Sequence, residues 1–458
     1  MMRPIKCIGW IMLMASAAAI FLSGCFGIQT QGEKQARGEA KSLSEAYRPG
    51  DRKTTLPVLD NKVTLSTLLT YAMLNQPKVE VAYYEYLASV EKITTERSLS
   101  DPKLTFQMDI TNVISSIMPG LMLDVPWPTK LTARAAVATE ESKAKYYLYE
   151  RDVLQTAYDV KRAYYNLHFL QDRIRINREM LAVAGKLEES ARTQNEAGKA
   201  TLQDVLRAQM EQERLKTEIA NLEDSRNPLL SKLKAALGMT YEQENPPMPA
   251  KFEPTVMDIS SDKLYAIAME RNPQLKSMEA EVRAADEGIS LAQKSRLPDF
   301  TIGIEADVKA APVLWRPRFD ITLPIWLDKI AAEIDAAQAK KQASSARFTS
   351  EQIQLAVEFA DKSYMYREAS RNLKLLSGGL IAKAKLSLEV AQAAYSSGKT
   401  DFINLIEAER TYLEFQLAEV EARLQCELAL SELSLIIGEK PEKAPIPNKP
   451  VKEGADTK

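Results

Sequence analysis

The sequence has little histidine, glycine and cysteine, and it has no surplus of basic charge. Its 458 residues include 1 His, 17 Gly and 3 Cys, with 60 Lys and Arg against 62 Asp and Glu. A single histidine argues against a metal or acid–base site built on imidazole. The balanced charge argues against nucleic acid as a partner, because phosphate binding needs a concentrated basic surface. Few glycines together with abundant helix-forming residues are typical of long helices.

The first 24 residues predict a signal peptide for export. Arg3 and Lys6 precede an apolar run of about 15 residues, which is shorter than a typical membrane span. The run ends in Leu-Ser-Gly-Cys, which resembles the bacterial lipobox. That resemblance implies cleavage before Cys25 and acylation of this cysteine, and Phe26 after it implies delivery to the outer membrane. Several acyl chains would give stable anchoring. An uncleaved apolar anchor with an incidental cysteine is the alternative.

The mature chain would keep one free thiol. Cys7 leaves with the signal and Cys25 is acylated, so Cys426 remains and no intrachain disulfide can form. Residues 25–60 are polar and predict an extended, lipid-anchored N-terminal arm. Residues 441–458 predict a polar C-terminal tail.

The residues between these ends form two copies of one pattern. Five landmarks recur in the same order, at an offset that drifts only from 196 to 200 residues. The pairs are Pro77 and Pro273, Pro102 and Pro298, Pro126 and Pro324, Gly198 and Gly398, and Gly238 and Gly438. The duplication predicts a first repeat at 61–240, a Pro-rich linker at 241–258 and a second repeat at 259–440.

Each repeat predicts a β-hairpin between helices. Apolar and polar residues alternate around 104–127 and again around 300–325, which indicates strands with one apolar and one polar face. A helix of about 24 residues precedes each hairpin, and a long helix follows it, over about 130–197 and 329–397.

A final helix completes each repeat. It ends at Gly238 or Gly438, because Gly favours the left-handed conformation at a helix end. Pro228 predicts a break near Asn227 in the first copy only. At 1.5 Å per residue the two shorter helices placed end to end match the long helix, so each copy predicts a rod about 100 Å long with the hairpin at one end.

Four strands with one apolar face cannot close a barrel by themselves, whereas three copies would supply twelve. The lipoprotein signal, the duplicated helix–hairpin–long helix–helix unit, Asn272-Pro273 and a Gly-x-x-x-Leu/Phe turn at each helical tip resemble the TolC-type outer-membrane efflux protein family. The resemblance covers about residues 60–440.

The resemblance implies a mainly α fold with a small β part, assembled as a homotrimer. A twelve-stranded outer-membrane β-barrel would continue into a twelve-helix periplasmic α-barrel. It further implies a passive exit duct of a tripartite efflux pump, with a periplasmic adaptor, an inner-membrane transporter and outer-membrane lipid as partners. No cofactor, no metal site and no enzymatic activity are implied.

The resemblance also assigns residues to the two ends of the duct. The periplasmic aperture would be lined by Asp204, Arg207, Asn404 and Glu407. Asn404 departs from the acid usual in the family, and Thr400 replaces an Arg that locks the gate in some members, so the charge of the aperture is open. The adaptor would dock at the tip turns, formed by Gly198, Lys199, Gly398, Lys399 and Thr400.

Trp127 and Trp326 follow the strands, and such aromatics suit a membrane interface. The stretch Val-Pro-Trp-Pro-Thr-Lys at 125–130 resembles members that serve heavy-metal pumps of the resistance-nodulation-division class. Heavy-metal and drug efflux both stay open at this point.

Two other classes of protein compete with a channel. A lipid-anchored periplasmic coiled-coil scaffold would explain the helices but not four alternating strands at equivalent places. An exported enzyme would need convergent polar residues, which the sequence does not show. Ser397-Gly398-Lys399-Thr400 imitates the end of a phosphate-binding loop, but its twin at 197–200 indicates a repeated turn.

Overall fold

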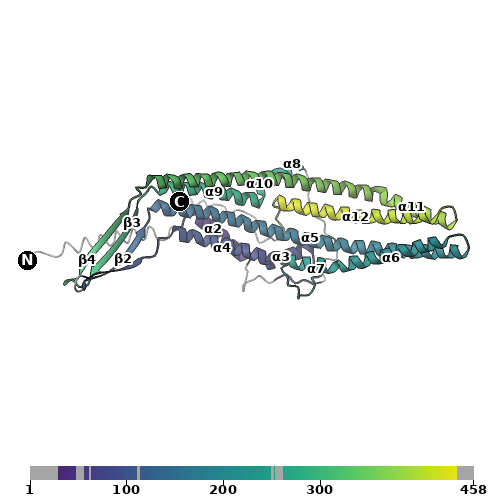
Figure 1. Cartoon of the computed structure of the whole chain (residues 1–458), viewed down its shortest axis with the longest axis horizontal. Helices are drawn as coiled ribbons and strands as arrows, with labels where there is room; N and C mark the ends of the chain where they lie inside the picture. Colours follow the sequence, from purple (N-terminus) through teal and green to yellow (C-terminus); the bar gives the residue numbers. More distant parts are fainter. Residues whose placement is uncertain are drawn as a thin grey trace, which may run out of the picture.

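The computed structural model describes residues 29–47, 56–60, 63–110, 114–248, 252 and 261–440. Over these residues the chain is an elongated helical body with one small sheet at its end (Figure 1). The signal peptide 1–24, Cys25 and the tail 441–458 lie outside the described residues, as does half of the linker 241–258.

The two repeats run through equivalent elements in the same order. The first contains α3 (Leu65–Asn75), α4 (Pro77–Arg97), β1 (Lys103–Ile110), β2 (Ile114–Val125), α5 (Pro128–Glu196), α6 (Leu202–Asp224) and α7 (Arg226–Ala236). The second contains α8 (Ser261–Arg271), α9 (Pro273–Lys294), β3 (Asp299–Asp307), β4 (Leu314–Thr322), α10 (Leu327–Leu375), the π-helical turn η2 (Leu376–Leu380), α11 (Ile381–Ser396) and α12 (Phe402–Ile436). The predicted duplicated unit of helix, hairpin, long helix and helix is confirmed.

Short helices meet end to end beside each long helix, as their lengths predicted. Asn75 Nδ2 donates to the carbonyls of Leu237 and Gly238, both at 3.0 Å. In the second repeat Asn272 Nδ2 donates to the carbonyl of Ile436 at 2.9 Å. These amides satisfy carbonyls at helix ends that otherwise lack an intrahelical partner. The side chain of Asn272 also accepts from the Leu275 amide, so Asn272 is the N-cap of α9.

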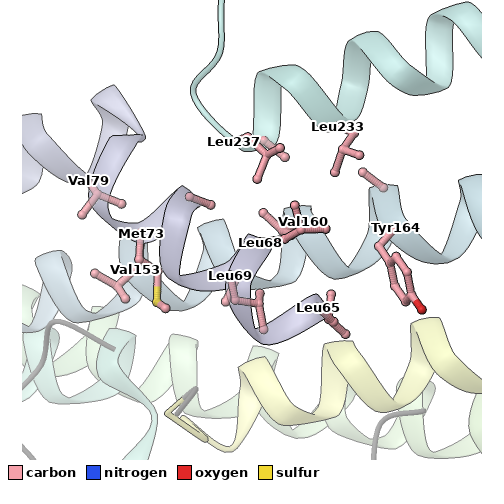
Figure 2. Packing of buried hydrophobic residues seen from close by; sticks show 14 of the residues in the cluster. Leu65, Leu68, Leu69, Met73, Val79, Val153, Val160, Tyr164, Leu233 and Leu237 are labelled. Atoms are coloured by element: carbon pink, nitrogen blue, oxygen red, sulfur yellow. The ribbon is translucent and has the colours of Figure 1, made fainter. Parts of the chain in front are cut away.

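The largest core lies where α3, α4 and α7 pack on the middle of α5. Figure 2 shows Leu68, Met73, Val160 and Leu233 converging from these elements. The predicted seam of α5 is buried here, with Val153, Val160 and Tyr164 fully enclosed. Burial of such side chains, at roughly 1.5–3 kcal/mol each, joins helices that are distant in sequence.

The final helix of the first repeat breaks where Pro228 predicted it. α6 ends at Asp224 and α7 begins at Arg226, with Ser225 between them. The second repeat has no such break, because α12 runs unbroken for 35 residues.

The long helix of the second repeat is interrupted, and the expectation of one continuous helix over 329–397 is wrong. α10 ends at Leu375, and the π-helical turn η2 joins it to α11. Gly379 in this turn has φ of 150°, which L side chains rarely adopt. Two adjacent glycines, Gly378 and Gly379, have no counterpart in α5 and allow this turn to form.

The predicted extended arm at 25–60 is also wrong over its middle part. Residues Gln31–Tyr47 form α2, a helix of 17 residues. Its Ala36, Ala40, Leu43 and Tyr47 follow the 4-3-4 spacing of an apolar helix face, and they are buried in the core with α4 and α5. The polar composition of the segment gave no sign of this face, because two of its four residues are small alanines.

A buried ion pair fixes α2 at its N-terminal end. Glu33 is fully enclosed, with its carboxylate 2.6 Å from Arg97 Nε and 3.1 Å from Arg37 Nε. Burial opposes ionisation of Glu33, but hydrogen bonds from Arg97, Thr94 and Arg37 outweigh it and hold its pKa below the usual range. α2 therefore begins beside the end of α4, close to the start of β1.

The four strands form one antiparallel sheet in the order β1-β2-β3-β4. The two hairpins join through β2 and β3, where Leu121 lies opposite Ile304 and Asp124 opposite Thr301. β1 and β4 are thus the two free edges of the sheet in a single chain (Figure 1).

Candidate functional site

The helical end of the molecule is built from two equivalent turns. Gly198 and Gly398 have φ of 68° and 70°, in the left-handed region. The Lys199 amide donates to the Gln194 carbonyl at 2.8 Å, and the Lys399 amide donates to the Ala394 carbonyl at 2.9 Å. These bonds cap α5 and α11 in the Schellman pattern. The stretch Ser397-Gly398-Lys399-Thr400, which imitates the end of a phosphate-binding loop, is therefore a helix-capping turn.

The five predicted docking residues lie at this end of the molecule. Gly198, Lys199, Gly398 and Lys399 are exposed, and Thr400 is half-buried. Their side chains and backbones are accessible to another protein in the single chain.

Apolar packing holds the two tips together. The cluster contains Leu187 and Ala191 of α5, Val205 and Ala208 of α6, Leu388 and Tyr395 of α11, and Phe402, Leu405 and Ile406 of α12. Gln194 Nε2 also donates to the Tyr395 carbonyl at 3.1 Å across the two repeats. The tips therefore form one four-helix end (Figure 1).

The four predicted aperture residues lie one or two turns behind the tips. Asn404 and Glu407 are exposed on α12, and Asp204 and Arg207 are half-buried on α6. Within the described residues no hydrogen bond or ion pair joins the first two to the second two. A single chain therefore does not assemble them into one ring.

Two of these residues also have a local role. Asp204 Oδ2 accepts from the Thr201 amide at 3.1 Å, which completes a capping box at the start of α6. Asn404 Nδ2 donates to Thr400 Oγ1 at 3.1 Å. Burial, and then the charge of Asp204, raise the pKa of Tyr395, so this carboxylate lies near the phenol.

Sequence reasoning missed a charged cluster between α6 and α12. Glu211 and Glu409 are almost fully enclosed, at 3% and 2% exposed. Glu211 binds Arg214 on its own helix and Arg410 Nη2 of α12 at 2.9 Å. Burial alone would raise the pKa of Glu211, but bonds from the two arginines outweigh it and lower the pKa.

Glu409 differs from Glu211 because neither of its buried carboxyl oxygens has a hydrogen-bond partner in the part of the chain that the structure describes. Burial, and then the charge of Glu211, raise its pKa to about 7. A signal was present in the sequence: Glu409 follows Phe402, Leu405 and Ile406 at helical spacing, on the apolar face of α12.

The strand end of the molecule presents two contrasting surfaces. On one face of the sheet the side chains are apolar and exposed, with Leu104 81%, Phe106 64% and Phe319 59% accessible in the single chain. Ile302 lies opposite Phe319, and Ile304 lies opposite Leu121, which is itself opposite Leu104, so both isoleucines belong to the same face. Ile321 belongs to it as well, because it lies two residues from Phe319 on β4.

Ion pairs and polar contacts cover the other face. Arg318 binds both Glu305 and Asp320. Asp124 binds Lys103 and accepts from Thr301 Oγ1 at 2.8 Å. Such a sheet separates an apolar from a polar environment.

Trp127 and Trp326 occupy equivalent corners between strand and helix. Each is the N-cap residue of the long helix that follows, α5 or α10. Trp127 packs on Phe300, and its backbone amide donates to Asp299 Oδ1 at 3.0 Å. Lys130 Nζ binds both oxygens of Asp299 at 2.9 Å, so this corner joins the two repeats.

The remaining chemistry-bearing residues lie in packed surroundings. His168 contacts the rings of Tyr164, Phe169 and Phe252, and burial lowers its pKa. Cys426 is buried, and burial raises the pKa of its thiol to about 11. Among the described residues no group of three or more His, Cys, Asp or Glu side chains is placed to hold a metal ion. None of the described helices is long and apolar enough to cross a membrane.

A long duplicated helical body that ends in a sheet with one apolar and one ion-paired face defines the class of outer-membrane channel proteins. The model of the outer membrane efflux protein family matches residues 111–239 and 264–439. These segments follow the two repeats and cover more than half of the chain. The chain therefore belongs to the outer membrane efflux protein family, whose members are efflux channels of the outer membrane.

Solved structures share this fold at low sequence identity. The outer-membrane channel OprN is 16% identical over 86% of this chain and 96% of its own, with a TM-score of 0.73. A membrane protein from Pseudomonas aeruginosa is 18% identical over 83% and 91%, with a TM-score of 0.72. The outer membrane protein VceC from Vibrio cholerae is 18% identical over 82% and 96%, with a TM-score of 0.69. The comparison with curated proteins gave no match.

Proposed function

We propose that three copies of this chain form the exit duct of a tripartite efflux pump. The observation that carries the proposal is the sheet, whose apolar face exposes large side chains such as Leu104, Phe106 and Phe319 in a single chain, at the end of a helical body about 100 Å long. Exposed apolar patches of this size mark a membrane or protein interface. Three sheets would close a twelve-stranded barrel with this face toward lipid.

The proposal also assigns roles to the helical tips, to Cys25 and to the corners between strands and helices. The tip turns, with Gly198 and Lys199 in the first repeat and Gly398, Lys399 and Thr400 in the second, would dock a periplasmic adaptor, which couples the duct to an inner-membrane transporter. Cys25 would carry the lipid anchor, and Trp127 and Trp326 would mark the membrane interface. The corner at 125–130 favours a transporter of the resistance-nodulation-division class, with heavy metals or drugs as cargo.

The aperture would form only when three subunits bring Asp204 and Glu407 around one axis. Asp204 also caps α6, so its removal would disturb the helix, whereas Asp204→Asn keeps an acceptor oxygen at that position. Asp204→Asn with Glu407→Gln therefore changes charge with little change of shape.

The test is single-channel conductance of the detergent-purified lipoprotein in a planar bilayer, together with its mass in solution. We expect a trimer with small, cation-preferring steps, and we expect the double variant to lose most of this preference because fixed acids attract cations to a narrow opening. If the double variant forms a trimer with unchanged selectivity, the proposed duct stands, but these residues do not line its aperture. A monomer or dimer that never conducts would contradict the proposal and favour a lipid-anchored scaffold.

A further inference from the structure

Among the residues that the structure describes, no strand lies beside the two edges of the sheet, β1 and β4. Such edges expose unpaired backbone N–H and C=O groups. The duplication predicts which strand pairs with each edge, because the chain already contains a junction between the hairpins of its two repeats. At that junction β2 of the first repeat pairs with β3 of the second.

This internal junction can serve as a template for the junction between subunits. β4 is the counterpart of β2, and β1 is the counterpart of β3. Landmarks beside the junction give a first alignment: Pro126 corresponds to Pro324 at an offset of 198, and Pro102 to Pro298 at an offset of 196. Relative to these landmarks the two hairpins differ by two residues, because Lys103 lies opposite Met122 whereas Asp299 lies opposite Thr322. The landmarks therefore give the register to within two residues, and the facing side chains decide among the registers that remain.

We propose that β4 of one subunit pairs antiparallel with β1 of the next, with Thr322 opposite the partner's Thr105 and Arg318 opposite the partner's Asp109. The inference rests on the proposed trimeric duct and adds the register of its subunit interface. Asp124 lies opposite Thr301 at the internal junction, and their counterparts at the subunit interface are Thr322 and Thr105. Gly120 lies opposite Glu305 at the internal junction, and their counterparts are Arg318 and Asp109.

The side chains that this register brings together are complementary. Leu323, Ile321 and Phe319 come to lie opposite the partner's Leu104, Phe106 and Met108, so that apolar residues continue the exposed face across the junction. On the polar face Arg318 meets an acid. The Thr105 hydroxyl is buried and has no hydrogen-bond partner among the described residues of its own subunit, and Thr322 would supply one.

Other registers are less favourable for stated reasons. A slip of one residue would place every apolar side chain on the polar face. A slip of two residues in one direction would put Asp320 opposite the partner's Asp109, and like charges directly opposite are destabilising. A slip of two in the other direction would take Arg318 from Asp109 to Gln107.

The ion pair at the corner of the internal junction has no equivalent between subunits. Within the chain Lys130 binds Asp299 at the strand–helix corner. Their counterparts are Lys329 and Lys103, so two lysines would meet between subunits. Lys103 is already paired with Asp124 in its own subunit. Strand pairing, without a corner ion pair, would therefore hold this end of the interface.

Disulfide trapping tests the register in the full-length lipoprotein. With Cys426→Ala as background, Thr105→Cys is combined with Thr322→Cys. Directly opposed residues of antiparallel strands have Cα atoms about 4.5–5.5 Å apart, which suits a disulfide. The matched controls are Thr105→Cys with Asp320→Cys and Gln107→Cys with Thr322→Cys, which report the two slipped registers from the same face.

After mild oxidation we expect covalent dimers and trimers on non-reducing gels for the first pair, at least about tenfold above either control. Arg318→Cys with Asp109→Cys reports the same register if the threonine pair fails to assemble. A native trimer that cross-links through a slipped pair, or through none of these pairs, would overturn the register and leave the duct standing. A monomeric mass for the parent protein would instead overturn the duct.

Discussion

Single residues set the charge balance at the helical end, and Glu409 is the most informative of them. Its carboxyl group is enclosed without a partner, and its pKa is raised to about 7 by burial and by Glu211. Because folding favours the protonated form, the folded state binds this proton more tightly than the unfolded chain. Its protonation should therefore couple the pH to the stability of the contact between α6 and α12.

We expect Glu409 to make the protein less stable as the pH rises from about 4.5 to about 7, and to add no further change above that window. The ordinary pKa of 4.5 and the raised value near 7 define this range. The full effect is on the order of 3 kcal/mol. Glu211 has a lowered pKa, so its own contribution changes below the window.

The measurement is the melting temperature from circular dichroism between pH 5 and 8.5. Glu409→Gln imitates the protonated form and should flatten the pH dependence, with its gain over the parent largest above pH 7. The exposed neighbour Glu407→Gln is the control and should keep the parent's slope. Parallel curves for the parent and Glu409→Gln would contradict this account of Glu409.

Whole elements depend on a few places where the backbone approaches another helix. Gly238 ends the helical run of the first repeat with φ of 70° and lies against Asn75, the last residue of α3, and Gln76, which precedes α4. A Cβ there would be 2.6 Å from the Asn75 carbonyl oxygen. Gly198 has nearly the same φ, but no atom lies within 4 Å of the position of its Cβ.

Comparing Gly198 with Gly238 separates the stability cost of backbone strain from the cost of close packing. Gly198→Ala should cost about 1 kcal/mol from its positive φ alone. Gly238→Ala should cost more, roughly 2–4 kcal/mol, because the end-to-end contact between α7 and α4 must also shift. Thermal melts of both variants provide the comparison, and equal losses would mean that the close approach contributes nothing.

At the scale of the whole molecule, the apolar face of the sheet decides whether the chain enters a membrane. Phe106 and Ile304 lie on that face, and Gln107 points to the opposite one. A carboxylate on a lipid-facing position is destabilising, whereas the same change on the polar face is tolerated.

We expect Phe106→Asp with Ile304→Asp to reduce the trimer recovered from outer membranes by at least about tenfold. Gln107→Asp is the control and should leave recovery close to that of the parent. The measurement is detergent extraction followed by determination of mass. A double variant that remains a stable trimer in buffer without detergent would show that the face does not contact lipid.

Sequence patterns were sufficient wherever a local rule applies. The period of two in both hairpins, the stops at Gly238 and Gly438 and the break before Pro228 depend on residues within one or two turns. The duplication added the order of elements, because equivalent landmarks imply equivalent structure. The match of the family model to both repeats agrees with that reading.

Tertiary structure decided what depends on distant neighbours. α2 forms because its small apolar face finds α4 and α5, and Glu33 finds Arg97, which is 64 residues away. Glu409 is enclosed because α12 packs against neighbouring helices, with the charge of Glu211 on α6 nearby, although its type predicts an exposed side chain. The periodicity of the sequence predicts which face of a helix or strand is apolar, but only the tertiary structure determines which element covers that face. The same limit applies between subunits, where the sequence leaves β1 and β4 as edges and the folded junction of β2 with β3 supplies their register.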